Sequence, residues 1–256
     1  MKTIVLATAL FALTGIAFAA IAQTPQTTQH ENAGPNPNIV RWHEAEILYQ
    51  TMKEKRARGS ERFSIMVHPD KTWTLITHND IFARNAVMNV VMRVSDTFRP
   101  IEAFTAYWND GGFKGSGVFR IRGNQMTAEI NGPSGHFTQS TYAPDAFSLL
   151  SHPLAFDGWH GGTYDKKVGG VQRIATLNID AISKPQNPIL ATPMDQTWEL
   201  KGIEEVTVPA GTFTTEHYRV NDFDVWVMGA DRVLVKYQWP SLDREYLLTN
   251  YLAGPK

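Results

Sequence analysis

Most of the chain beyond residue 60 alternates between apolar and polar side chains. Successive side chains of a β-strand point to opposite faces of a sheet, so this period of two predicts strands with one buried face. Residues that form tight turns separate the runs, most clearly at residues 109–112 and 209–211. The pattern predicts a meander of antiparallel strands, and such short spacing between strands favours a barrel or a strongly curved sheet.

One segment in front of these strands follows a helical period instead. Over residues 39–58, apolar side chains recur at the spacing of one helix face, and charged side chains occupy the opposite face. Gly59 suits the end of such a helix, so we predict one N-terminal helix here. Its basic end, residues 53–58, either complements the helix dipole in solvent or makes a peripheral contact with anionic lipid headgroups of the envelope membrane. The apolar positions are Trp42, Ala45, Leu48, Tyr49 and Met52.

The β pattern is interrupted once, at residues 147–165. Two histidines, two aspartates and a tyrosine stand there among apolar and glycine residues. Because strands are predicted on both sides, we expect this segment to form a helical or loop plug across the open face of a curved sheet. The predicted fold is therefore mainly β: a curved antiparallel sheet or half-barrel with one N-terminal helix and a mid-chain plug. The apolar side chains that would form the plug are Phe147, Leu149, Leu150, Phe156 and Trp159.

The first 22 residues have the features of a secretory signal peptide. Lys2 precedes an apolar run at residues 4–20, and small residues near its end offer a cleavage site. A retained membrane anchor is the alternative, although the run is shorter than the ~20 apolar residues of a spanning helix. Residues 23–38 are polar and rich in proline, which predicts a disordered leader. We expect residues 39–256 to form a single β-rich domain that is periplasmic or secreted.

The composition of the chain argues against nucleic-acid binding and against cysteine chemistry. The chain has 24 Lys and Arg against 25 Asp and Glu, and this balance argues against nucleic acid as a partner, because phosphate binding needs a basic surface. It has no cysteine, so neither a disulfide framework nor a thiolate nucleophile is available. The hydrophobic content of 43% is sufficient for a core that holds the fold together without cross-links.

The candidate chemistry lies in the interrupted segment. The chain has no Gly-x-Ser-x-Gly elbow, His-Glu-x-x-His motif or Walker loop. In an acid–base site, His152 or His160 would exchange a proton, Asp157 or Asp165 would orient the ring, and Tyr164 would donate to a developing oxyanion. In the alternative reading these residues only shape turns.

A metal site would need further ligands from outside this segment, at a spacing that matches no metal signature. We therefore expect neither a metal nor another cofactor.

A second group of residues suggests ligand binding. If the sheet curves, Arg99 could bind the carboxylate of a ligand, although pairing with the neighbouring Glu102 is the commoner arrangement. The seven tryptophans and thirteen phenylalanines suit either a cavity for an apolar molecule or a large core. The candidate ligand-binding residues are Arg99, Tyr107, Trp108, Phe156 and Trp159.

One segment carries a resemblance to a known group. Residues 206–213, Val-Thr-Val-Pro-Ala-Gly-Thr-Phe, resemble the V-x-V-P-A-G-T-F signature of exported bacterial β-proteins of unknown function. Residues 224–237 are similar to the tryptophan-bearing hairpin that follows it in those proteins. The resemblance covers residues 198–251 and implies a fold related to periplasmic lipoprotein carriers and outer-membrane lipoprotein receptors, which are half-barrels with helices on the concave side. It implies no catalytic residue, and that fold serves both acyl-chain carriers and a small enzyme of pigment biosynthesis.

We therefore predict an exported binding protein that holds a hydrophobic molecule, lipid-like or aromatic, in the cavity of a curved β-sheet. The alternative is a cofactor-independent lyase, isomerase or hydrolase that uses His152, Asp157, His160 and Tyr164. A third possibility is an interaction protein of the cell envelope without a small ligand. Convergence of the two histidines with Asp157 in the fold would favour the enzyme.

Overall fold

The computed structural model describes residues 36–145 and 147–255. Contacts between residues divide the chain into residues 1–34 and 35–256, and all of the described residues belong to the second unit. The predicted signal peptide and most of the predicted leader therefore lie outside the described residues. Among the residues that are described, no helix has the length and hydropathy of a membrane span.

The described chain folds into one sheet of fifteen strands, with only short helical turns between them. The helical turns are η1 (Phe82–Arg84), η2 (Leu154–Phe156), α1 (Asp157–His160), η3 (Gly161–Thr163) and η4 (Pro240–Leu242). The strands are β1 (Arg41–Gln50), β2 (Ala57–Val67), β3 (Trp73–Ile81), β4 (Ala86–Val94), β5 (Pro100–Asn109), β6 (Gly112–Arg122), β7 (Gln125–Gly132), β8 (Gly135–Tyr142), β9 (Phe147–Leu150), β10 (Val171–Ile179), β11 (Ala191–Val208), β12 (Gly211–Val220), β13 (Phe223–Met228), β14 (Val233–Trp239) and β15 (Arg244–Pro255).

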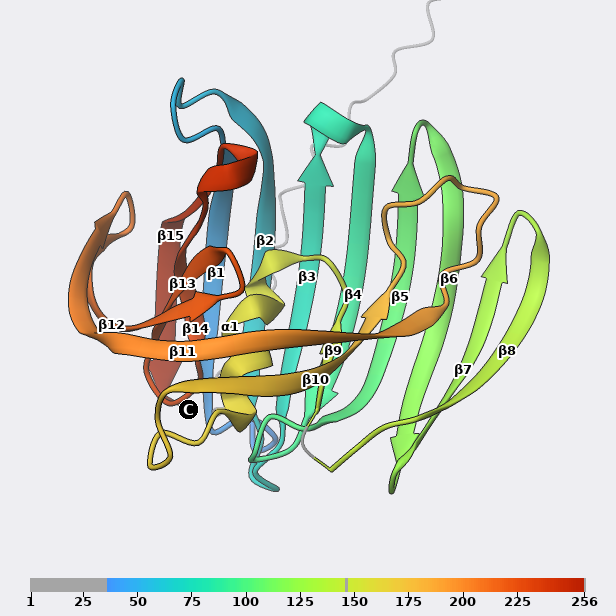
Figure 1. Cartoon of the computed structure of the whole chain (residues 1–256), viewed down its shortest axis with the longest axis horizontal. Helices are drawn as coiled ribbons and strands as arrows, with labels where there is room; N and C mark the ends of the chain where they lie inside the picture. Colours follow the sequence, from blue (N-terminus) through green and yellow to red (C-terminus); the bar gives the residue numbers. More distant parts are fainter. Residues whose placement is uncertain (1–35, 146, 256) are drawn as a thin grey trace, which may run out of the picture. The chain divides into compact units, whose positions relative to one another are not determined.

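The strand order is β8-β7-β6-β5-β4-β3-β2-β1-β15-β14-β13-β12-β11-β10-β9. Neighbouring strands run antiparallel except for β9 and β10, which run parallel. The pairing of β1 with β15 joins two long meanders in the middle of the sheet. The sheet is strongly curved, and β8 and β9 are its two edges (Figure 1). The prediction of a mainly β fold built on a curved antiparallel sheet is confirmed.

The prediction of an N-terminal helix is wrong. Residues 41–50 form β1, and residues 51–56 are the turn that leads into β2. Ala45, Ile47 and Tyr49 are buried in alternation, which is the period of a strand. The same ten residues also contain apolar side chains at helical spacing, so the sequence pattern fits both periods. Pairing with β15 on one side and β2 on the other decides in favour of the strand.

The interrupted segment packs on the concave side of the sheet, as the plug prediction requires. It begins with β9 and continues as η2, α1 and η3, which Figure 1 shows in front of the first strands. We call residues 151–164 the plug. Phe156 and Trp159 are buried in it, and Trp159 packs against Phe98 from the turn between β4 and β5. The plug therefore completes the core between the two halves of the sheet.

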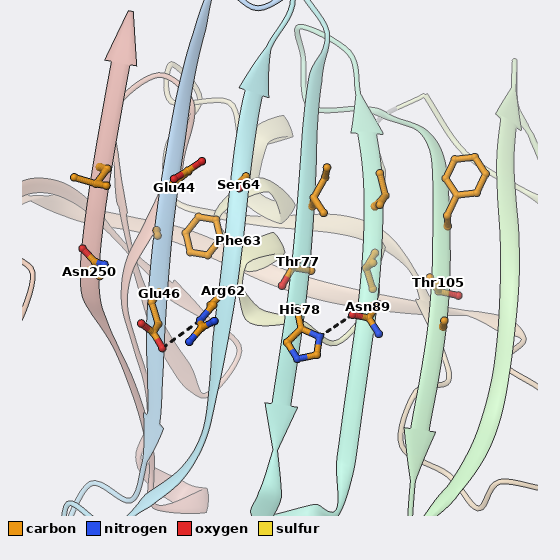
Figure 2. Close-up of a pocket in the computed structure, with 17 residues that line it drawn as sticks. Glu44, Glu46, Arg62, Phe63, Ser64, Thr77, His78, Asn89, Thr105 and Asn250 are labelled. Atoms are coloured by element: carbon orange, nitrogen blue, oxygen red, sulfur yellow. Dashed lines mark hydrogen bonds and ion pairs between the residues drawn. The ribbon is translucent and has the colours of Figure 1, made fainter. Parts of the chain in front are cut away.

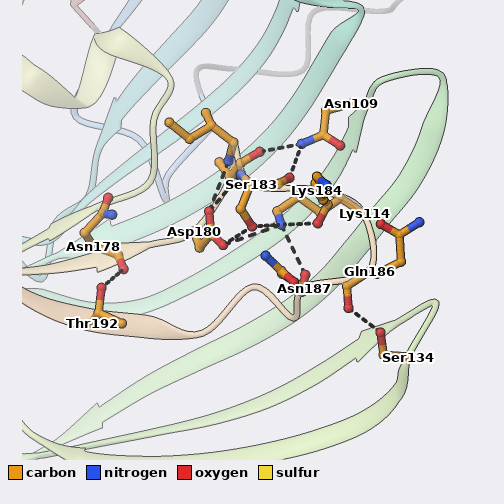
Figure 3. A network of polar contacts seen from close by, with 12 residues as sticks. Asn109, Lys114, Ser134, Asn178, Asp180, Ser183, Lys184, Gln186, Asn187 and Thr192 are labelled. Carbon is orange, nitrogen blue, oxygen red and sulfur yellow. Dashed lines mark hydrogen bonds and ion pairs between the residues drawn. The ribbon is translucent and has the colours of Figure 1, made fainter.

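A buried lysine fastens the loop between β10 and β11. The side chain of Lys114 is fully buried, and its Nζ donates to Ser183 Oγ at 2.9 Å and to the carbonyl of Asn187 at 3.1 Å (Figure 3). Asp180 lies 3.6 Å from the same nitrogen. Burial lowers the pKa of Lys114, and the charge of Asp180 opposes this shift. These contacts make Lys114 a structural residue.

Glycines allow the plug to approach the sheet closely. A Cβ atom on Gly158 would lie 2.2 Å from the carbonyl oxygen of Arg232, and one on Gly161 would lie 2.5 Å from the ring of Trp198. Both distances are shorter than any van der Waals contact, and the first is to backbone. The glycines of this segment are therefore needed for packing.

We predict that Gly158→Ala lowers the free energy of unfolding by about 1–3 kcal/mol, because the plug must move away from the turn before β14. Urea denaturation measures this change. Gly112→Ala is the matched control, since the nearest atom to its added Cβ is 3.8 Å away. Equal stability of the two variants would contradict the close packing of the plug.

Candidate functional site

Asp157 and His160 lie at the centre of the plug. His160 Nε2 is 3.4 Å from Asp157 Oδ1, and His160 Nδ1 is hydrogen-bonded to Ser148 Oγ on β9. All three residues are buried. The one-turn spacing of Asp157 and His160 on α1 brings them to the same face of the helix, as the sequence suggested.

Burial favours the neutral form of both members of this pair. It lowers the pKa of His160 to about 3, and the positive charge of Arg232 adds to the shift. It also raises the pKa of Asp157 well above its ordinary value, with a further contribution from the carboxylate of Glu61. The pair is therefore poorly suited to hold charge at neutral pH.

A serine, a histidine and an aspartate in contact have the composition of a nucleophile, a base and an orienting acid. In this arrangement, however, His160 Nε2 has no hydrogen-bond partner in the described part of the chain. A reacting group would have to reach buried atoms beneath the plug. The contacts link β9 to α1, and the catalytic role of the pair stays a prediction.

The other two predicted catalytic residues lie apart from this pair. The hydroxyl of Tyr164 donates to the carbonyl of Gly170 at 2.7 Å and accepts from the amide of Leu200 at 3.3 Å. His152 stands at the start of the plug with a φ of 71°, and burial together with the charge of Arg84 lowers its pKa to about 4. The contacts of these two residues do not include Asp157 or His160.

A buried acid missing from the sequence prediction holds the beginning of the plug. The carboxyl of Glu61 on β2 accepts hydrogen bonds from Tyr49 (2.5 Å) and Thr77 (2.7 Å), and from the amides of Leu154 (2.8 Å) and Ala155 (3.1 Å). Burial raises its pKa, and the four hydrogen bonds oppose that shift. The signal was present in the sequence, because Glu61 is in phase with the buried positions that follow it on β2.

Most of the predicted ligand-binding residues make contacts that hold the plug, or the segments next to it, in place. Arg99 donates to the carbonyls of Asp145 (3.0 Å) and Gly123 (2.7 Å). Tyr107 is buried and donates to the carbonyl of Ser151 at 3.0 Å, and burial raises its pKa.

Of the three remaining aromatic candidates, two are in the core. Phe156 is fully buried, and Trp159 donates to the carbonyl of Asp231 at 3.0 Å. Trp108 instead faces outward, 39% exposed, beside Phe113. A role for these residues in ligand binding stays a prediction.

A groove of about 730 Å³ crosses the outer face of the sheet, over β15 and β1 to β5 (Figure 2). Residues two apart on a strand share a face, so strand register aligns the outward side chains of this region in rows. One row is apolar: Ile76, Val91 and Phe104 are direct neighbours on β3, β4 and β5. Ile76 and Phe104 are each 43% exposed.

A polar row runs beside the apolar one, two residues away from it on each strand. Register places Arg62, His78 and Asn89 next to one another on β2, β3 and β4. His78 Nδ1 is 2.8 Å from Asn89 Oδ1, and Arg62 lies 3.8 Å from Glu46 (Figure 2). The groove therefore presents an apolar side and a polar side to solvent.

Comparison with known proteins supports the fold. No family model matches the chain, and no curated protein matches its sequence. It is similar in structure to a β-barrel-like protein of the domain-of-unknown-function family DUF1849 from Brucella abortus, with a TM-score of 0.50, 7% sequence identity, and coverage of 85% of this chain and 98% of the other. At that identity the similarity concerns the fold alone, which in this chain is a curved sheet that stays open between β8 and β9.

Two further solved structures are less similar. A DUF1089 family protein from Pseudomonas aeruginosa has a TM-score of 0.43 at 12% identity and covers 71% of this chain and 90% of its own. A Bacteroides fragilis protein with a YmcC-like fold, whose name proposes that it is exported, has a TM-score of 0.27 at 7% identity and covers 82% and 95%.

The depressed pKa of His160 predicts a pH dependence of stability. Between pH 6.5 and about 3 the unfolded chain binds a proton at this residue and the folded protein does not. The stability that neutral His160 preserves is therefore complete above pH 6.5 and is lost as the pH falls, by about 1.4 kcal/mol for each pH unit. Urea denaturation at pH 7 and at pH 5 should show that the stability difference between wild type and His160→Gln shrinks by roughly 2 kcal/mol.

His78→Gln, at an exposed histidine, is the control for this experiment. A difference between wild type and His160→Gln that is the same at both pH values would show that His160 is accessible to protons in the folded state.

Proposed function

We propose that the protein is an exported binding protein for an amphipathic, lipid-like molecule, and that the ligand lies in the outer groove. The observation that carries the proposal is the pairing of an apolar row with a polar row across neighbouring strands. From the sequence we predicted that the ligand lies in a cavity inside the curved sheet. The plug and core side chains fill that side, so the proposal places the ligand on the opposite face.

The apolar row suits a hydrocarbon chain. Three side chains on adjacent strands form a strip roughly 10 Å long, since strands lie about 4.8 Å apart. A contiguous row of exposed apolar side chains on a sheet face is typical of a surface that binds a ligand or a partner. The groove volume of about 730 Å³ is that of a small-molecule site.

The polar row suits a headgroup. The side chain of Arg62 is 78% exposed, and its ion pair with Glu46 is long, so its N–H groups can turn toward an acidic group on the ligand. His78 and Asn89 add further hydrogen-bonding atoms beside it. An apolar tail and a polar or anionic head would thus meet matching surfaces two residues apart.

Export is the part of the proposal that rests on the sequence. The apolar run at residues 4–20, with small residues at its end, is typical of a cleaved signal. A lipid-binding protein outside the cytoplasm would encounter its ligands at the envelope.

Phe104→Asp should weaken the binding of lipid-like molecules. It removes the aromatic side chain from the row and adds a charge, which weakens binding by roughly 2 kcal/mol, or about 30-fold. Mass spectrometry of lipids retained through native purification of the two proteins, followed by titration with the identified lipid, measures this effect. Ile203→Asp is the control, because Ile203 is a 71% exposed apolar residue outside the groove. Equal retention of lipid by wild type and both variants would contradict the proposal.

An enzyme is the second candidate, favoured by the contact of His160 with Asp157 and Ser148. We predict that a fluorophosphonate probe, which reacts with activated serines, leaves Ser148 unlabelled, because the serine is buried. Peptide mass spectrometry of wild type and of Ser148→Ala measures the labelling. A covalent adduct on Ser148 would instead support the hydrolase.

A further inference from the structure

Three turns come together at one end of the sheet. They are residues 51–56 between β1 and β2, residues 82–85 between β3 and β4, and residues 240–243 between β14 and β15, at the top of Figure 1. Strand pairing makes them neighbours, because Gln50 is opposite Glu245 and Ser60 is opposite Asp80. We call these three segments, with the strand residues that adjoin them, the turn end.

Two large apolar side chains protrude from the turn end. Phe82 in η1 is 57% exposed, and Leu242 in η4 is 46% exposed. Both stand in single 3₁₀ turns that close with a residue in the left-handed region, Asn85 and Asp243. The tight turns hold both side chains outward, where they contribute nothing to the core.

Four arginines belong to the same three segments and the strand residues that adjoin them. Among the described residues, no acidic side chain pairs with Arg56, Arg58, Arg84 or Arg244, whereas Lys55 is paired with Glu245. Burial, followed by the charges of Arg244 and Arg84, lowers the pKa of Arg58, which agrees with the closeness of these guanidinium groups. The basic residues of the turn end are Lys53, Lys55, Arg56, Arg58, Arg84 and Arg244, and its acidic residues are Glu54, Asp80, Asp243 and Glu245. Asp222 adds one more carboxylate from the turn between β12 and β13, where it accepts a hydrogen bond from Ser241.

We propose that the turn end docks on an anionic lipid bilayer, with Phe82 and Leu242 inserted among the headgroups and the arginines in contact with lipid phosphates. Protruding apolar side chains beside basic ones are the combination that binds such surfaces, by burial of apolar area and by attraction to anionic lipids. Guanidinium groups also match the geometry of phosphate oxygens.

Charge favours a bilayer over a second copy of this chain as the occupant. Two turn ends brought together by a twofold axis would place their unpaired arginines against one another. The chain as a whole is nearly neutral, with a formal charge of −1, so the attraction is local to this end. The proposal is independent of the outer groove, which lies on the face of the sheet and has other residues.

Vesicle flotation tests the proposal with the chain purified after export, whose first residue is established by intact mass so that the apolar N-terminal run is known to be absent. Binding is expected to vesicles of phosphatidylethanolamine with phosphatidylglycerol, and not to phosphatidylcholine vesicles, and it should weaken as salt is raised. Arg84→Gln with Arg244→Gln should weaken binding about 30-fold, the contribution of two such charges at a membrane surface. Phe82→Ser with Leu242→Ser should weaken it by at least a similar factor, at unchanged melting temperature.

Matched control variants remove the same kinds of side chain outside the turn end. Arg120→Gln with Arg173→Gln removes two paired arginines, and Val171→Ser with Ile203→Ser removes two exposed apolar side chains. Both control proteins should bind like wild type.

Absence of binding to the anionic vesicles, or equal loss of binding in the control variants, would overturn the proposal. So would a dimer in solution that Phe82→Ser with Leu242→Ser converts to a monomer, because a second copy would then occupy the turn end. Phe104→Asp should leave flotation unchanged, which separates this proposal from the groove.

Discussion

The buried carboxyl of Glu61 is the interaction on which the packing of the plug depends. It joins three strands to the plug, because its partners are Tyr49 on β1, Thr77 on β3 and the amides of Leu154 and Ala155 at the start of η2. A buried acidic group without partners is strongly destabilising, and four donors around this one offset its loss of water. The two amides would themselves be unpaired at the start of a helical turn, so the carboxyl and the turn satisfy each other.

The second half of the sheet holds the opposite side of the plug. Trp159 donates to the carbonyl of Asp231, and Arg232 donates to the carbonyl of Gly158. Burial opposes ionisation of the Asp231 carboxyl, but hydrogen bonds from Arg41, His43 and Trp73 lower its pKa nonetheless. One turn, between β13 and β14, thus binds both the plug and the first strands. The concave side becomes a continuous core, and the two proposed binding surfaces, the outer groove and the turn end, lie outside it.

The strands were predictable because alternation is a local property of the sequence. The prediction from alternation failed at residues 41–50, where apolar side chains fit a helical period as well as a strand period. Only pairing with the two neighbouring strands decides between the two structures. The plug was predictable as an interruption, and its internal contacts were not, because His160, which lies beside Asp157, meets Ser148 from a separate strand. Glu61 was visible as an acid in phase with buried neighbours. The outer groove depends on the register of six strands, and each strand contributes side chains that look unremarkable in its own sequence.

The same packing separates the two functional candidates physically. A substrate could reach Ser148, Asp157 and His160 only if the plug left the concave side. That movement would break the hydrogen bonds of Leu154 and Ala155 to the buried acid, and those made by Trp159 and Arg232 on the other side. Exchanging each of these hydrogen bonds for water costs about 0.5–1.5 kcal/mol, and exposing the buried side chains of Phe156 and Trp159 costs about 1.5–3 kcal/mol each. Several such losses together approach the entire stability of a typical domain, about 5–15 kcal/mol. Opening the plug is therefore close to unfolding the protein, whereas a ligand can enter the outer groove without breaking any of these bonds.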